Sequence, residues 1–214
     1  MGKLQGMFLF NKRVGNVVGR KARGGGWDVA IYQGIVKNPN TEPQQMQRTK
    51  FRMVGKLISP LTSFLSITFN DSNAKQTGET AQNAFMRVNI KDAISGTWPN
   101  YSLDYSKLAV AKGILDNVYN PSMTFQDTEM ELSWSDNSGI GNAKATDHVM
   151  VCIYNATKGV SKIDTDVAAR NERTASLAVP SSWSGDTVHV YICCKRDNSN
   201  VCSGSIYLGQ QVIS

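Results

Sequence analysis

The chain has 214 residues, of which 41% are hydrophobic and 19% charged, and its formal net charge is +6. These values are typical of a folded globular protein and exclude an intrinsically disordered one. The longest early apolar run, residues 7–10, is too short for a membrane span or a signal peptide, so we expect no membrane contact and a protein made and kept in a cytoplasm.

The charge is distributed unevenly along the chain. Residues 1–56 hold 11 basic and 2 acidic residues (+9), whereas residues 101–214 hold 9 basic and 12 acidic residues (−3). Such asymmetry indicates contact with nucleic acid or docking on an acidic neighbour, and a solvated basic surface is the alternative. The candidate residues for assembly or phosphate contact are Lys12, Arg13, Arg20, Lys21 and Arg23.

Sequence-specific DNA reading is not expected. The basic residues do not lie on a recognisable recognition helix, and aromatic residues that could stack on bases are not interleaved with them. Nonspecific electrostatic contact with DNA through the N-terminal arm is the most that the pattern supports.

Residues 1–40 are predicted to form an extended, glycine-rich basic arm or loose hairpin with one strand at residues 27–36. Dense glycine weakens both helix and strand, and Gly24-Gly25-Gly26 would be the hinge. A phosphate-binding loop is the alternative. It would require a Lys and a Ser or Thr after the glycines, where Trp27 and Asp28 stand instead.

Residues 41–98 are predicted to be helical. Thr41 and Gln44 have the spacing of a capping box, and an amphipathic pattern follows as far as residue 58. Pro60 is expected to end or kink this helix and to begin a second short one. A third helix is predicted to start at Thr77 or Thr80 and to end before residue 96.

Beyond residue 98 the apolar period changes from 3.6 to 2, which predicts a domain at residues 99–214. About seven short strands separated by turn residues favour an immunoglobulin-like antiparallel β-sandwich, so the fold class is mainly β, with the arm and two or three short α-helices preceding the sandwich. The predicted strands are 107–112, 129–135, 148–154, 173–179, 187–195 and 201–209, with a weak one near residue 160.

The cysteines and histidines do not have the spacing of a metal site. There is no C-x-x-C, and we expect four buried free thiols at Cys152, Cys193, Cys194 and Cys202. His148 and His189 lie in alternating strand patterns and are expected to be structural, although a site shared with the cysteines is the alternative. No metal and no cofactor are predicted.

Catalytic residues are not predicted either. Asp164 with Asp166, and Glu129 with Glu131, would share a strand face as paired carboxylates do in some hydrolases. Solvent-facing strand residues have the same pattern, and neither histidine lies in a recognisable triad. We therefore expect a protein that is not an enzyme.

Several segments carry a resemblance to a known family. They are residues 13–19 (RVGNVVG), 38–41 (NPNT), 103–108 (LDYSKL), 179–191 (VPSSWSGDTVHVY) and 205–209 (SIYLG), together with Gln44, Gln45, Gln47, Arg48, Lys50 and Phe51. In this order they resemble domain of unknown function 6266, an uncharacterised family of Bacteroidetes bacteria and their phages. The glycine run at residues 24–26 departs from the usual N-terminus of that family.

The resemblance implies a phage virion context. Combined with the basic arm and the sandwich, it predicts a non-catalytic structural protein such as a tail, collar or ring protein of the head–tail connector, which self-associates and contacts neighbouring virion proteins. Its location would be the virion, assembled in the host cytoplasm. The alternatives are a sandwich-borne recognition module that binds a glycan or surface protein, and a nonspecific DNA-contacting protein.

Overall fold

The computed structural model describes residues 2–4, 12–21, 25–34, 38, 40–70 and 78–214. The chain divides into two compact units, Met1–Gln44 and Gln45–Ser214. Each unit is described by itself below.

The N-terminal unit contains a small antiparallel sheet of four strands, in the order β1-β4-β3-β2. Gly15, at the turn between β2 and β3, has a φ of 59°, a value that glycine adopts readily at the first position of a two-residue hairpin loop. The predicted extended arm with one strand is therefore wrong, whereas its alternative, a hairpin, is observed at β2–β3. Pairing turns short segments with weak strand patterns into strands. The strands are β1 (Gly2–Leu4), β2 (Lys12–Val14), β3 (Val17–Lys21) and β4 (Trp27–Ile31).

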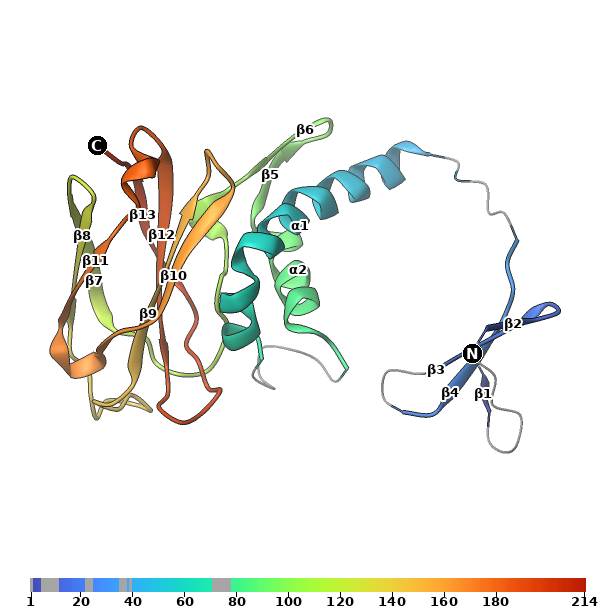
Figure 1. The fold of residues 1–214 in the computed structure, drawn as a ribbon, viewed down its shortest axis with the longest axis horizontal. Coiled ribbons are helices and arrows are strands. Elements are labelled where there is room, and N and C mark those ends of the chain that lie inside the picture. The colour runs from blue at the N-terminus through green and yellow to red at the C-terminus, as the bar shows by residue number, and fades with distance from the viewer. Residues whose placement is uncertain (1, 5–11, 22–24, 35–37, 39, 71–77) are drawn as a thin grey trace. The chain divides into compact units, whose positions relative to one another are not determined.

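The second unit begins with two helices, α1 (Glu42–Thr68) and α2 (Ala81–Asp92). Of the two predicted outcomes at Pro60 the kink is observed, since α1 bends but continues through this residue (Figure 1), and the predicted second short helix is wrong. The bent helix is held because both sides of Pro60 bury apolar residues, and because the Ser161 hydroxyl donates to the Pro60 carbonyl oxygen at 2.6 Å. The predicted start of the last helix at Thr80 is confirmed, since its hydroxyl accepts from the Asn83 N–H at 3.2 Å.

A β-hairpin and a short 3-10 helix follow α2, and a sandwich of two antiparallel sheets completes the unit. One sheet has the order β10-β9-β12-β13 and the other β11-β8-β7. The elements are β5 (Ile94–Thr97), β6 (Asn100–Leu103), η1 (Tyr105–Lys107), β7 (Tyr119–Gln126), β8 (Glu129–Ser135), β9 (His148–Asn155), β10 (Val160–Ala169), η2 (Arg170–Glu172), β11 (Thr174–Ala178), η3 (Ser181–Trp183), β12 (Thr187–Lys195) and β13 (Ile206–Val212).

The mainly β class and the antiparallel sandwich are confirmed, whereas the immunoglobulin-like arrangement is not. In an immunoglobulin constant domain the two sheets contain strands A, B, E and D and strands C, F and G. The strand that follows strand C therefore belongs to the opposite sheet. Here the strand that follows β9, namely β10, pairs with β9 itself. The predicted strand at residues 107–112 is absent, because this segment contains the end of η1 followed by irregular chain.

The four-stranded sheet is buried on both faces. Val149, Val151 and Ile153 of β9 pack in the core between the two sheets, whereas the alternating Met150 and Cys152 pack in a second core with both helices. The helices thus form a third layer on the outer face of this sheet, as Figure 1 shows. The structure therefore places the helices and the sandwich in one compact unit, where the sequence predicted a boundary after residue 98.

Candidate assembly interface

The N-terminal sheet carries most of the basic residues predicted as contact residues. Lys12 and Arg13 lie in β2, and Arg20 and Lys21 lie in β3. Arg23 lies outside the described residues. The structure therefore brings four of the five predicted residues onto one small sheet.

Strand register divides these four residues between two faces. Directly opposed residues of an antiparallel pair share a face, and residues two apart along a strand share it as well. Arg13 opposes Val18 and Arg20 opposes Asp28, which places both arginines on one face, here called the charged face. Lys12 and Lys21 belong to the opposite face. The predicted basic residues thus do not form a single cluster.

Arg13 is the best-positioned residue of the charged face. Its Nε donates to the Gly15 carbonyl oxygen at 2.8 Å, and its guanidinium carbon lies 3.6 Å from the centre of the Tyr32 ring. A cation over an aromatic ring is attracted by the negative face of the ring. Arg13 is consequently held in place by its own sheet.

The opposite face of the sheet is apolar. The register aligns Val14 with Val17, Val17 with Ile31, and Lys21 with Trp27. Val14 is 62% exposed and Ile31 is 80% exposed. We define the apolar face as Val14, Val17, Trp27, Val29 and Ile31, with Lys12 and Lys21 at its margins.

Exposure varies across this apolar face, since Val14 and Ile31 are exposed, whereas Val17, Trp27 and Val29 are half-buried. Among the described residues of that unit, the only element outside the sheet is the start of α1. A sheet with one apolar face is normally packed against a second layer. The sequence did not reveal this face, because Val14 and Val17 looked like isolated apolar points until pairing aligned them with Ile31.

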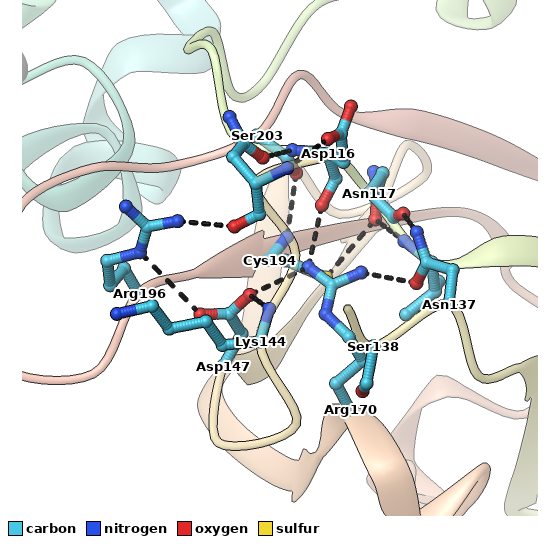
Figure 2. Close-up of polar contacts among 12 residues, drawn as sticks. Asp116, Asn117, Asn137, Ser138, Lys144, Asp147, Arg170, Cys194, Arg196 and Ser203 are labelled. Carbon is cyan, nitrogen blue, oxygen red and sulfur yellow. Dashed lines mark hydrogen bonds and ion pairs between the residues drawn. The ribbon is translucent and has the colours of Figure 1, made fainter. Parts of the chain in front are cut away.

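The second unit contains a buried polar cluster around Arg170 at one end of the sandwich (Figure 2). The Arg170 side chain is fully buried and lies 3.1 Å from Oδ2 of Asp147, which is also fully buried. Arg170 also donates to the Asn137 Oδ1 at 2.7 Å and to the Asp116 carbonyl oxygen at 2.6 Å. Asp147 Oδ2 accepts in addition from the Lys144 N–H at 2.8 Å.

This cluster connects loops and does not present a reactive group. Arg170 contacts chain segments near residues 116, 137 and 147, and the Trp134 indole N–H donates to the Arg170 carbonyl oxygen at 2.7 Å. A buried arginine paired with a carboxylate and bonded to several loops fixes their positions relative to one another. The sequence offered no signal for it, since Arg170 and Asp147 are 23 residues apart.

The two histidines have different surroundings. His148 lies between two carboxylates, with Nδ1 2.6 Å from Asp166 Oδ1 and Nε2 3.2 Å from Asp197 Oδ1. The hydrogen bond with Asp166 raises the pKa of His148. His189 is almost fully buried, and burial lowers its pKa. Asp166, one member of the predicted Asp164–Asp166 carboxylate pair, is therefore a hydrogen-bond partner of His148.

All four cysteines are buried. Burial raises the pKa of Cys152 to about 12 and that of Cys194 to about 11, so both thiols are protonated at neutral pH. Among the residues that the structure describes, no group of three or more His, Cys, Asp or Glu side chains could hold a metal ion. No helix in the described part of the chain is long and apolar enough to cross a membrane.

Comparison with known proteins identifies the family. Residues 9–209 match the family of unknown function DUF6266. The chain belongs to this family. A search of the curated proteins finds no match. Among solved structures, this DUF6266 protein is similar to the fn3 domain of the human collagen alpha-1(XX) chain, with 17% identity, 49% of this chain and 85% of that chain covered, and a TM-score of 0.33.

Proposed function

We propose that this DUF6266 protein is a non-catalytic assembly protein whose N-terminal sheet docks on another copy of the same chain. The observation that carries the proposal is the apolar face of that sheet, on which Val14 and Ile31 are 62% and 80% exposed. Exposed apolar patches rimmed by polar residues are typical of protein interaction sites.

Charge complementarity favours a second copy as the occupant. Residues 1–44 hold 7 basic and 2 acidic residues (+5), whereas residues 101–214 carry −3. A basic unit that docks on the acidic sandwich of the next chain makes a head-to-tail interface. Interfaces of this kind generate rings when the rotation closes and filaments when it does not.

The finer assignment within this proposal is a phage virion component, namely a tail, collar or ring protein of a phage that infects Bacteroidetes. It is supported by the resemblance of several segments to the DUF6266 family and by an architecture suited to head-to-tail assembly. Neighbouring virion proteins would be further partners, and assembly would take place in the host cytoplasm. Nonspecific DNA contact stays a prediction, now assigned to the charged face with Arg13 and Arg20.

The absence of catalysis is also part of the proposal. The two most buried candidate groups, Arg170 and Asp147, are paired with each other, and the cysteines that could act as nucleophiles are buried and protonated. These features suit a structural role, because a nucleophile needs access and a partner that activates it.

The test uses the double variant Val14→Thr, Ile31→Thr. Threonine keeps the β-branched shape and strand preference but adds a hydroxyl, so the sheet should persist while its apolar face weakens. In sedimentation velocity, we expect the variant to shift toward the 23.5 kDa single chain relative to the parent protein. The measured quantity is the mass-average mass across a concentration series.

The matched control is Val160→Thr, Val212→Thr, which alters two valines of the second unit that are 41% and 56% exposed. It should assemble as the parent does. Equal masses for both double variants would contradict the proposal. A parent that remains a single chain at every concentration would contradict it as well, since the apolar face would then be covered by its own chain or by a different protein.

A further inference from the structure

A polar pocket of about 310 Å³ lies at the junction of the β5–β6 hairpin, η1 and the strands β12 and β13. It is separate from the Arg170 cluster and belongs wholly to the second unit. The size is at the lower end of the range for small-molecule sites, which is roughly 300–1,000 Å³. The side chains that matter below are Asp104, Tyr105, Ser106, His189, Tyr207 and Gln210.

One wall of the pocket is aromatic and held in place. The rings of Tyr105 and His189 are stacked, with centroids 4.0 Å apart and an interplanar angle of 18°. The Tyr191 hydroxyl donates to the Tyr105 carbonyl oxygen at 2.8 Å, which fixes η1 against the sheet. The Tyr207 hydroxyl lies 3.0 Å from His189 Nδ1. The wall is therefore preorganised.

His189 has one ring nitrogen available to a ligand. Burial lowers its pKa, so the ring is neutral at pH 7 and one nitrogen is a donor while the other is an acceptor. Nδ1 is engaged with Tyr207. Within the described part of the chain Nε2 makes no hydrogen bond, although the ring lines the pocket. Nε2 is accessible to solvent, so water or a ligand can bond to it.

The pocket also contains a carboxylate whose charge is balanced. Asp104 Oδ1 accepts from the Ser106 N–H at 3.1 Å and from its hydroxyl at 2.5 Å, and Oδ2 lies 3.3 Å from Lys107 Nζ. The Ser106 hydroxyl bond is the main cause that lowers the pKa of Asp104, so the carboxyl is ionised at neutral pH. The Asp104–Lys107 pair is neutral overall, which disfavours both strongly anionic and strongly cationic ligands.

Three of the segments that resemble the family converge at this pocket. Residues 103–108 supply Asp104 and Tyr105, residues 179–191 supply His189, and residues 205–209 supply Tyr207. The first and last of these segments are more than 80 residues apart in the chain. The fold brings their polar and aromatic side chains together.

We propose that this pocket binds one sugar unit of a neutral glycan, an activity beyond the assembly role. Sugar hydroxyls both donate and accept, which suits a set that contains an acceptor carboxylate, a Gln210 amide, a tyrosine hydroxyl and one open imidazole nitrogen. The C–H face of a sugar ring is apolar and packs on aromatic side chains, here the partly exposed Tyr207, since one face of Tyr105 is covered by His189. The volume accommodates one sugar ring with its bound water.

The histidines provide an internal control for the binding experiment. The chain has only two histidines, and they lie at opposite ends of β9 and β12, since His189 pairs with Tyr154 and His148 with Lys195. In the full-length protein, histidine ring resonances are followed by NMR during titration with neutral methyl glycosides of glucose, galactose, mannose, fucose and N-acetylglucosamine. At least one glycoside should shift the His189 ring signals and leave those of His148 unchanged.

Variants test whether the shifts come from this pocket. Tyr207→Phe removes the hydroxyl that orients His189, and Gln210→Ala removes an exposed amide at the rim, so each should weaken binding by about tenfold. Tyr119→Phe, which alters an exposed tyrosine of β7, is the matched control and should bind as the parent does. The assignment of the two histidine signals comes from His148→Gln.

Three outcomes would overturn the proposal. No response of the His189 signals to any glycoside at about 10 mM would exclude affinities of physiological use. Equal binding by the parent and both pocket variants would place the site elsewhere. Stronger binding of sialic acid or a sugar phosphate than of the neutral glycosides would show that the ligand class is wrong. All three are independent of the mass measurement that tests self-assembly.

Discussion

At the scale of single residues, Arg170 is the largest fully buried side chain of the second unit. Its guanidinium and the Asp147 carboxylate are both 0% exposed, and they bond to loops from three parts of the chain. Removing one member of a buried ion pair leaves the other charge without compensation. The pair therefore fixes the positions of these loops, and each loop is connected to a strand of the sandwich.

Replacement of Arg170 by Met should lower the free energy of unfolding by about 3–5 kcal/mol, because Asp147 would remain buried with only the more distant Arg196, 3.9 Å away, as a counter-charge. Chemical denaturation followed by tryptophan fluorescence gives the value, with Trp134 close to the site. The control Lys144→Ala alters an exposed side chain nearby and should change stability by less than about 0.5 kcal/mol. A loss for Arg170→Met that is no larger than the control would refute this role.

His148 should make stability depend on pH. Its hydrogen bond with Asp166 raises its folded-state pKa above 6.5, so the stabilisation is fully present below pH 6.5 and is lost as pH rises through the folded-state pKa. Both carboxylates are largely exposed, which limits the effect to under about 1 kcal/mol. The comparison is parent against His148→Gln at pH 5.5 and pH 8.5. A difference that grows toward pH 8.5 would have the wrong sign.

At the scale of elements, the two halves of α1 differ in how deeply their apolar side chains are buried. Its second half buries Leu57, Leu61 and Phe64 against the four-stranded sheet, while Phe51 in its first half is 47% exposed. Burial of apolar side chains, and not helix propensity, stabilises such a helix. This packing is sufficient to carry the helix through Pro60.

Phe64→Ala should therefore destabilise the second unit by about 3–5 kcal/mol, because it leaves a cavity where helices and sheet meet. Phe51→Ala, on the same helix, should cost less than about 1 kcal/mol, since that ring is half exposed. Denaturant midpoints for the two variants provide the comparison. Similar losses for both would mean that the helices are not a layer of the core.

The sequence predicted those elements whose patterns are local. β8 and β12 match the predicted residues 129–135 and 187–195, because each has a run of suitable strand formers bounded by turn residues. β7 was missed, since residues 119–126 contain Pro121 and only partly buried apolar residues. The predicted strand at residues 107–112 failed because its apolar residues pack irregularly, with Leu108 and Val110 in the core beside the helices.

The candidate sites depended on contacts that the sequence could not reveal. The apolar face appears only when the register sets Val17 opposite both Val14 and Ile31. The Arg170–Asp147 pair and the pocket around His189 join residues that are distant in the chain. Composition shows that the basic charge is concentrated in the N-terminal part, but it could not divide that charge between two faces of a sheet.

At the scale of the whole molecule, the two units differ in how completely they bury their apolar residues. The second unit has two cores, one on each face of the four-stranded sheet. The N-terminal unit is a single four-stranded sheet with an apolar face on which Val14 and Ile31 are exposed. Three or more strands with a hydrophobic face gain stability by packing on another layer. The self-assembly that we propose through the N-terminal unit rests on this difference.

The most direct test is light scattering over a concentration series for the full chain and for a version that lacks residues 1–40. The truncation keeps Thr41 before α1 and retains both cores of the second unit. We predict that the full chain forms species heavier than 23.5 kDa as concentration rises, and that the truncated protein stays folded and monomeric. Equal particle masses for the two proteins, relative to their chain lengths, would contradict assembly through the N-terminal sheet.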